Sequence, residues 1–163
     1  MKKRTKKSLQ HNYKEYLGYL ILFGWAFVVD RLTKYWAINY LTTGYPITSF
    51  LSFEFVMNRG VAWGFFHSEA HGPFVLLSIM VFGVVMLLAS FAYRRLHEED
   101  LIVGEVLVIA GAISNILDRI VYQGVIDFII FSWRGFVFPA FNIADACIVI
   151  GVGIMFLSVY RKT

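Results

Sequence analysis

The residues of this chain best suited to acid–base chemistry are aspartates set among apolar residues. Asp127 stands in the strip VIDFII, whereas a loop carboxylate usually has polar neighbours. Poor solvation disfavours the charged form of a carboxyl group, so we expect the pKa of Asp127 to be raised. If Asp145 approaches Asp127, one proton shared between them would leave one acidic and one basic carboxyl at neutral pH. Such a pair could activate a water against a peptide carbonyl without a metal.

Two further polar pairs have helical spacing within apolar segments. Asp30 and Lys34 are four residues apart, so they share a helix face and could pair, either as a structural lock or as part of a site. Asn142 and Asp145 are three apart at the expected start of the last helix. There Asn142 could serve as the N-cap, and the helix dipole favours the anion of Asp145.

A third polar group is formed by Asn115, Asp118 and Arg119, which are related by spacings of three and four. Arg119 could neutralise Asp118, so this group could be mainly a scaffold. Charged residues at membrane depth are costly and normally face a bundle interior with a partner, which also makes function a default hypothesis for them.

The elements that carry these residues are predicted to cross a membrane. Hydrophobic residues make up 58% of the 163-residue chain and charged residues only 16%, with a mean hydropathy of +0.64, too little polar surface for a soluble globule. Four segments approach the roughly 20 apolar residues that a spanning helix needs. We therefore expect a mainly α-helical membrane protein of one domain, with transmembrane helices at about 16–41, 72–93, 101–121 and 141–160.

Charge asymmetry predicts the orientation of these helices. The basic tail 1–14, the 94–100 loop and the C-terminus carry most of the lysines and arginines, whereas the opposite connections offer Arg59 and Arg134. By the positive-inside rule, both termini are cytoplasmic. The helical rise then brings Asp30, Asp118 and Asp145 to one level, near the extracytoplasmic face. The net charge of +4 needs no nucleic-acid partner, because topology and anionic lipids account for it.

The two extracytoplasmic connections are too long and too apolar for simple turns. Segment 45–66 is rich in Phe, Val and Ser, with Pro46, Gly60 and Gly64 as breaks, which predicts a small β-rich region of short strands and turns. Segment 122–140 has breaks at Gly124 and Gly135 and predicts a short interfacial helix or strand.

Other chemistries find weaker support. His67 and His71 flank Glu69 but lack a third ligand and the HExxH pattern, so we expect no metal site and no cofactor. The lone Cys147, inside the last helix, is expected to pack. Two alternatives to a hydrolase remain open: a small proton- or cation-coupled transporter, since buried acids also mark ion paths, and a catalytically silent membrane assembly factor.

Taken in order, five motifs resemble the lipoprotein signal peptidase family, also called signal peptidase II. They are DRLTK at 30–34, NRGVAWG at 58–64, GAISNILDR at 111–119, VIDF at 125–128 and FPAFNIAD at 138–145. Two mild departures stand within them: Ser114 replaces a usual glycine and Trp63 a frequent phenylalanine.

The resemblance implies an aspartyl endopeptidase of the bacterial cytoplasmic membrane, working as a monomer among membrane lipids. Its substrates would be prolipoproteins, cut before a cysteine that carries diacylglycerol. Asp127 and Asp145 match the family's catalytic pair, and Asp118 would be structural. The remaining matched positions would support the site or the substrate: Asp30, Lys34, Asn58, Gly60, Asn115, Arg119 and Asn142.

Overall fold

The fold is taken from a computed structural model, which describes residues 6–60 and 71–160, with side chains for 13–60 and 72–160. Three features of the sequence fall outside the described residues: the first five residues of the basic tail, Trp63, and the side chains of the His67–His71 group.

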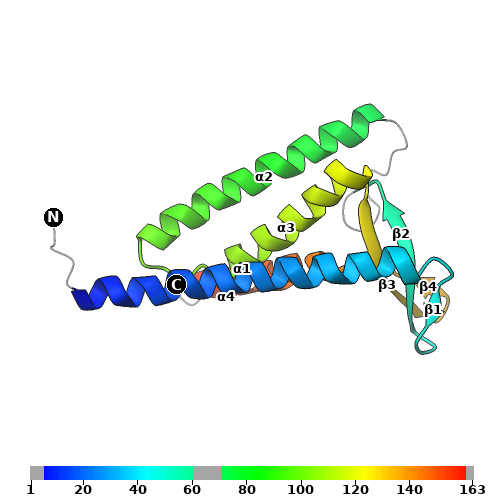
Figure 1. Ribbon diagram of the computed structural model, residues 1–163, viewed down its shortest axis with the longest axis horizontal. Coiled ribbons are helices and arrows are strands. Elements are labelled where there is room, and N and C mark those ends of the chain that lie inside the picture. The colour runs from blue at the N-terminus through cyan, green and yellow to red at the C-terminus, as the bar shows by residue number, and fades with distance from the viewer. Residues whose placement is uncertain (1–5, 61–70, 161–163) are drawn as a thin grey trace.

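Four helices make up most of the structure (Figure 1): α1 (Lys6–Tyr40), α2 (His71–His97), α3 (Val103–Tyr122) and α4 (Ile143–Tyr160). All four expected helices are present. The first begins at Lys6, so residues 6–14 of the predicted tail are helical. That stretch contains no glycine or proline and is rich in good helix formers such as Lys, Leu and Gln.

Among the residues that the structure describes, three helical segments are long and apolar enough to cross a membrane: Tyr13–Tyr40, Gly72–His97 and Ile143–Tyr160. Helix α3 does not meet this criterion, because its 20 residues include Glu105, Asp118 and Arg119. It is the central helix, and it packs against α1, α2 and α4. Its charged side chains are buried by these neighbours, which explains how an apolar bundle accommodates them.

The two connections that follow α1 and α3 form one antiparallel sheet with the order β1–β2–β3–β4. Its strands are β1 (Tyr45–Pro46), β2 (Leu51–Asn58), β3 (Val125–Trp133) and β4 (Phe136–Val137). The β-rich region predicted after the first helix is therefore present. Segment 122–140 also contains strands, one of the two possibilities expected for it, and these strands join the same sheet. Arg134 and Gly135 have φ of 49° and 83°, as a two-residue hairpin turn requires.

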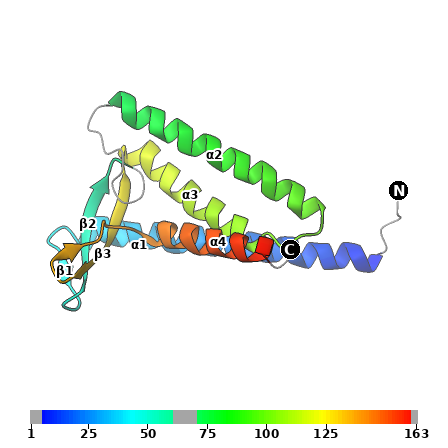
Figure 2. The ribbon, with the colours of Figure 1, turned by 180° about the vertical axis from the view of Figure 1, so that it is seen from behind.

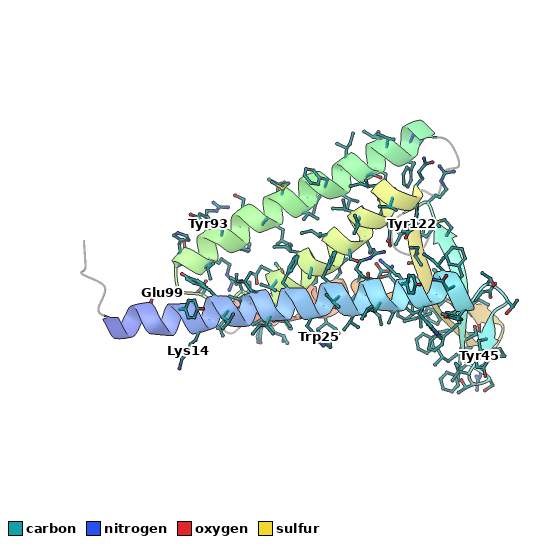
Figure 3. All side chains as sticks on the ribbon, viewed as in Figure 1. Lys14, Trp25, Tyr45, Tyr93, Glu99 and Tyr122 are labelled. Atoms are coloured by element: carbon teal, nitrogen blue, oxygen red, sulfur yellow. The ribbon has the colours of Figure 1, made fainter. Side chains whose placement is uncertain are left out.

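The sheet lies at one end of the helical bundle, and the start of α1 and the end of α4 lie toward the other end (Figures 1 and 2). The end of α1 is attached to β3 by a cluster of buried residues, Ala37, Leu41, Ile126 and Phe128. The outer helix faces are instead exposed and apolar, as at Trp25. Figure 3 shows Tyr45 and Tyr122 at the sheet end and Tyr93 at the opposite end.

Helices α3 and α4 approach until their backbones touch. A Cβ placed on Gly104 would lie 2.6 Å from the carbonyl oxygen of Gly151, and one on Gly111 would lie 2.4 Å from that of Ala144. Small residues at these positions allow the close contact. The contact at Gly111 sets how near the first turn of α4 lies to α3.

Candidate active site

Asp127 lies on β3, opposite Val56 of β2, and its side chain is 1% exposed. Its carboxylate accepts hydrogen bonds from Asn58 Nδ2 at 2.8 Å and from Asn142 Nδ2 at 2.7 Å. Burial raises the pKa of Asp127 to about 7, and the nearby charge of Asp145 acts in the same direction, while the two amide donors partly oppose the rise. Asp127 can therefore hold a proton near neutral pH.

Asp145 lies in the first turn of α4. Its Oδ1 accepts from Asn115 Nδ2 at 2.9 Å, and its Oδ2 accepts from the backbone N of Asn142 at 3.3 Å. In return, the backbone N of Asp145 donates to Asn142 Oδ1 at 2.9 Å. This reciprocal arrangement is a capping box, so Asn142 is the N-cap expected from the sequence.

Asn142 is completely buried and donates to both carboxylates, to Asp127 with its side chain and to Asp145 with its backbone. The structure thus brings together the two aspartates that the sequence singled out. One comes from a strand and the other from a helix, and a single asparagine lies between them.

Lys34 lies in a buried ionic cluster beside the two aspartates. Its Nζ contacts Asp30 Oδ2 at 2.8 Å, Asp118 Oδ2 at 2.7 Å and Asn115 Oδ1 at 2.6 Å. The pairing of Asp30 with Lys34 expected from the helical spacing is present. Asp118 Oδ1 is in turn bound by Arg31 at 2.5 Å.

Arg119 is not the partner of Asp118 that the sequence suggested. Its Nη2 donates to the carbonyl oxygen of Gly60 at 2.9 Å and its Nη1 to that of Asn115 at 3.3 Å. Consecutive helical residues point in directions about 100° apart, so Asp118 faces α1 while Arg119 faces the segment after β2. The backbone N of Gly60 donates to Asn58 Oδ1 at 2.8 Å, which places this segment beside Asp127.

Two residues of the cluster, Arg31 and Ser114, were not recognised as site residues from the sequence. Ser114 Oγ donates to Asp30 Oδ2 at 2.6 Å, and Arg31 Nη1 donates to Ser114 Oγ at 3.2 Å. One signal was available, since Ser114 precedes Asp118 by four residues and so shares its helix face. The direction of Arg31 depends on how α1 packs against α3.

An apolar cavity of about 330 Å³ reaches Asp145 from outside the polar cluster. Its walls come from β3, the segment after β4, and α4: Phe131, Phe138, Pro139, Phe141, Ala146 and Val149. Arg119 lies on a second cavity, of about 250 Å³, between α2 and α3. The first cavity can take up apolar groups next to Asp145.

Within residues 6–60 and 71–160, no group of three or more His, Cys, Asp or Glu side chains has an arrangement that could hold a metal ion. A buried and a half-buried carboxylate that share one asparagine, in a chain with helices suited to a membrane, form the arrangement expected of the class of membrane aspartic hydrolases.

Comparison with known proteins places the chain within this class. Residues 22–161 match the family model of signal peptidase (SPase) II. The chain is 32% identical over 147 residues to a lipoprotein signal peptidase of Clostridium tetani, covering 88% of this chain and 92% of that relative. It is 35% identical over 127 residues to one of Thermodesulfovibrio yellowstonii, covering 77% and 82%. The chain belongs to the signal peptidase II family.

A solved structure supports the fold independently. The structure of a bacterial membrane enzyme obtained by the in meso method at 2.3 Å superimposes with a TM-score of 0.72 at 23% identity, covering 89% of this chain and 88% of that one. At this identity the likeness concerns the fold alone. Since the family is one of peptidases, the protein is a peptidase.

Proposed function

We propose that Asp127 and Asp145 are the catalytic pair with which this protein removes signal peptides from prolipoproteins, cutting before a cysteine that carries diacylglycerol. The observation that carries this assignment is Asn142, which donates to the carboxylates of both the buried Asp127 and the half-buried Asp145. The raised pKa of Asp127, about 7, adds that one of the two can be protonated at neutral pH.

These environments suggest a role for each aspartate. Because the pKa of Asp127 is raised to about 7, Asp127 carries the proton, and Asp145 is the general base that takes a proton from the attacking water, whose oxygen bonds to the scissile carbonyl carbon. Asp127 is the general acid and gives its proton to the carbonyl oxygen, which forms a tetrahedral diol. On collapse the C–N bond breaks, Asp145 passes its proton to the leaving nitrogen, and Asp127 recovers one from the diol.

The surrounding polar residues hold this pair and the substrate. Asn58 and Asn115 orient the two carboxylates, while Arg119 keeps the carbonyl of Gly60 near Asp127. When a substrate backbone enters, the side-chain amides have donors and acceptors that suit a peptide group. The apolar cavity beside Asp145 suits apolar side chains of a signal peptide.

We further propose that all four helices span the bacterial cytoplasmic membrane, with both termini cytoplasmic and the sheet on the extracytoplasmic side. Lys14, Arg94 and Arg95 belong to the helix ends remote from the sheet, as the positive-inside rule requires. Because α3 is enclosed by the other helices, its charged residues do not prevent it from spanning. Substrate would then enter sideways from the bilayer, and a monomer provides the whole site.

A proton- or cation-coupled transporter and a silent assembly factor, the alternatives left open by the sequence, gain no support. Asp30, Asp118, Asp127 and Asp145 gather near the sheet end, and the acid at the other end, Glu105, is paired with Arg95, so the acids do not follow a path through the bundle; the family is one of peptidases. Purified protein in liposomes gives a direct comparison, since a transporter would show proton-linked uptake and a peptidase would cleave a lipopeptide.

The test of the catalytic pair is Asp127→Asn and Asp145→Asn, assayed with a fluorescent diacylglyceryl lipopeptide. Asparagine keeps the shape of the carboxyl but cannot exchange its proton, so each variant should lose at least about 10³-fold in kcat while staying folded and binding substrate. Glu54→Gln, an exposed acid on neighbouring β2, is the matched control and should stay active. Substantial cleavage by either single variant, or activity lost in EDTA and restored by zinc, would refute the assignment.

A further inference from the structure

Two backbone hydrogen bonds attach the catalytic segments to the ionic cluster around Lys34. The backbone N of Ile126, the residue before Asp127, donates to Asp118 Oδ2 at 3.3 Å. The backbone N of Ala144, the residue before Asp145, donates to Asp30 Oδ1 at 2.7 Å. Each catalytic aspartate is thus preceded by a residue whose N–H is held by a different buried carboxylate.

Both of these carboxylates are bound by the same ammonium group. Lys34 Nζ lies 2.8 Å from Asp30 and 2.7 Å from Asp118, and all three side chains are completely buried. Its third acceptor is Asn115 Oδ1 at 2.6 Å, and Asn115 Nδ2 donates to Asp145. The three acceptors match the three N–H donors of an ammonium.

We propose that Lys34 is a positioning residue, which sets the separation of Asp127 and Asp145 by holding Asp118 and Asp30 together. The inference rests on the proposed function, since it takes these two aspartates as the catalytic pair. Charge-assisted bonds below 3 Å are short and directional, so the cluster resists the sub-ångström shifts to which catalysis is sensitive. With Arg31 bound to Asp118, two cations offset two anions and the cluster is formally neutral.

A second buried ionic group shows what a purely structural role looks like in this protein. Arg95, near the end of α2, pairs with Glu105 in the first turn of α3 and with Asp100 in the connection between them. It joins two helices at the end of the bundle remote from the sheet. Lys34 differs because its two carboxylates also bind the backbone on both sides of the site.

The test is Lys34→Met, with kcat and KM measured on monodisperse protein and the lipopeptide substrate. Loss of positioning should lower kcat by about 100-fold and leave KM within about three-fold, because misplacement by about 1 Å penalises the transition state selectively. Affinity for a lipopeptide with a statine group, which mimics the tetrahedral diol, should fall in parallel with kcat. Glu105→Gln, which breaks the remote ion pair, should lower thermal stability and leave kcat, KM and statine affinity unchanged.

A folded Lys34→Met protein with a wild-type kcat would overturn the proposal, and so would an equal loss of kcat in Glu105→Gln. If Lys34→Met does not fold, Asp30→Asn and Asp118→Asn decide the matter, since each retains an oxygen for the backbone N–H. A fall in kcat at constant KM in these variants supports positioning, and an unchanged kcat in both refutes it. Asp127→Asn is run alongside: if it still cleaves, the catalytic assignment itself fails, whereas an inactive Asp127→Asn beside a normal Lys34→Met rejects positioning alone.

Discussion

Gly111 of α3 offers a steric test of how α4 presents Asp145. In Gly111→Ala the new Cβ would lie 2.4 Å from the carbonyl oxygen of Ala144, whereas real Cβ contacts essentially never fall below 3.0 Å. The first turn of α4 must therefore move by at least about 0.6 Å, and Asp145 is the next residue. A misplacement of about 1 Å costs about 100-fold in rate, so we expect kcat to fall by about 10- to 100-fold.

Two other glycines separate this effect from overpacking in general. Gly104→Ala also makes a forbidden contact, 2.6 Å from the carbonyl oxygen of Gly151, but about six residues or 9 Å further along α4 from Asp145. It should lower stability by about 1–3 kcal/mol, as overpacking does, with a much smaller loss of kcat. Gly153→Ala meets nothing within 4 Å and should leave kcat unchanged, with stability unchanged or slightly raised because alanine favours the helix.

The assay is lipopeptide cleavage on purified protein, with thermal unfolding followed in the same detergent. The order of kcat values should be Gly153→Ala, then Gly104→Ala, then Gly111→Ala. An undiminished kcat in Gly111→Ala, or an equal loss in Gly104→Ala, would refute the link between this helix contact and the position of Asp145.

Further predictions concern protonation, the catalytic pair and topology. Because burial raises the pKa of Asp127 to about 7, kcat should fall as pH rises through about 7 and the general acid ionises. In Asp127→Glu the midpoint pH of this fall should shift, and an unshifted midpoint in an active variant would contradict the role of Asp127. Because the folded protein binds this proton more tightly than the unfolded chain does, protonation of Asp127 adds to the free energy of unfolding. This contribution is fully present below about pH 3.8 and is lost as pH rises through about 7, which unfolding measured at several pH values can test. The double variant of Asp127 and Asp145 to asparagine should be hardly slower than either single one, since the two act as a unit, and a multiplicative loss would show independent roles. Reporters fused after Arg95 should be cytoplasmic and those after Ser132 external; the reverse result would overturn the proposed orientation.

Much of the site could be predicted because its signals are local. Asp127 stood out as one acid in an apolar strip, and the three-residue spacing of Asn142 and Asp145 predicted the N-cap that the structure contains. The pairing of Asp30 with Lys34 followed from one helical turn. In each case the partners are close in sequence or the environment is given by immediate neighbours.

The partners of Asp118 were predicted wrongly for the opposite reason. From sequence, Arg119 was the nearest cation, but the actual partners, Lys34 and Arg31, come from α1, more than 80 residues away. Which face of α1 meets α3 depends on packing across the bundle. The joining of β2 with β3 was missed likewise, since each strand finds its backbone partners only when the ends of α1 and α3 lie side by side.

The sequence by itself determined that the chain forms long apolar helices with basic ends and that aspartates lie in apolar surroundings, because run length, charge and neighbouring residues are properties of the chain. It also carried the family motifs. The tertiary structure decided which carboxylates meet, that Asn142 lies between Asp127 and Asp145, and that Lys34 connects the segments before both. Those distances depend on how closely backbones pack at Gly111 and on the pairing of distant strands, and neither is a property of any local stretch of sequence.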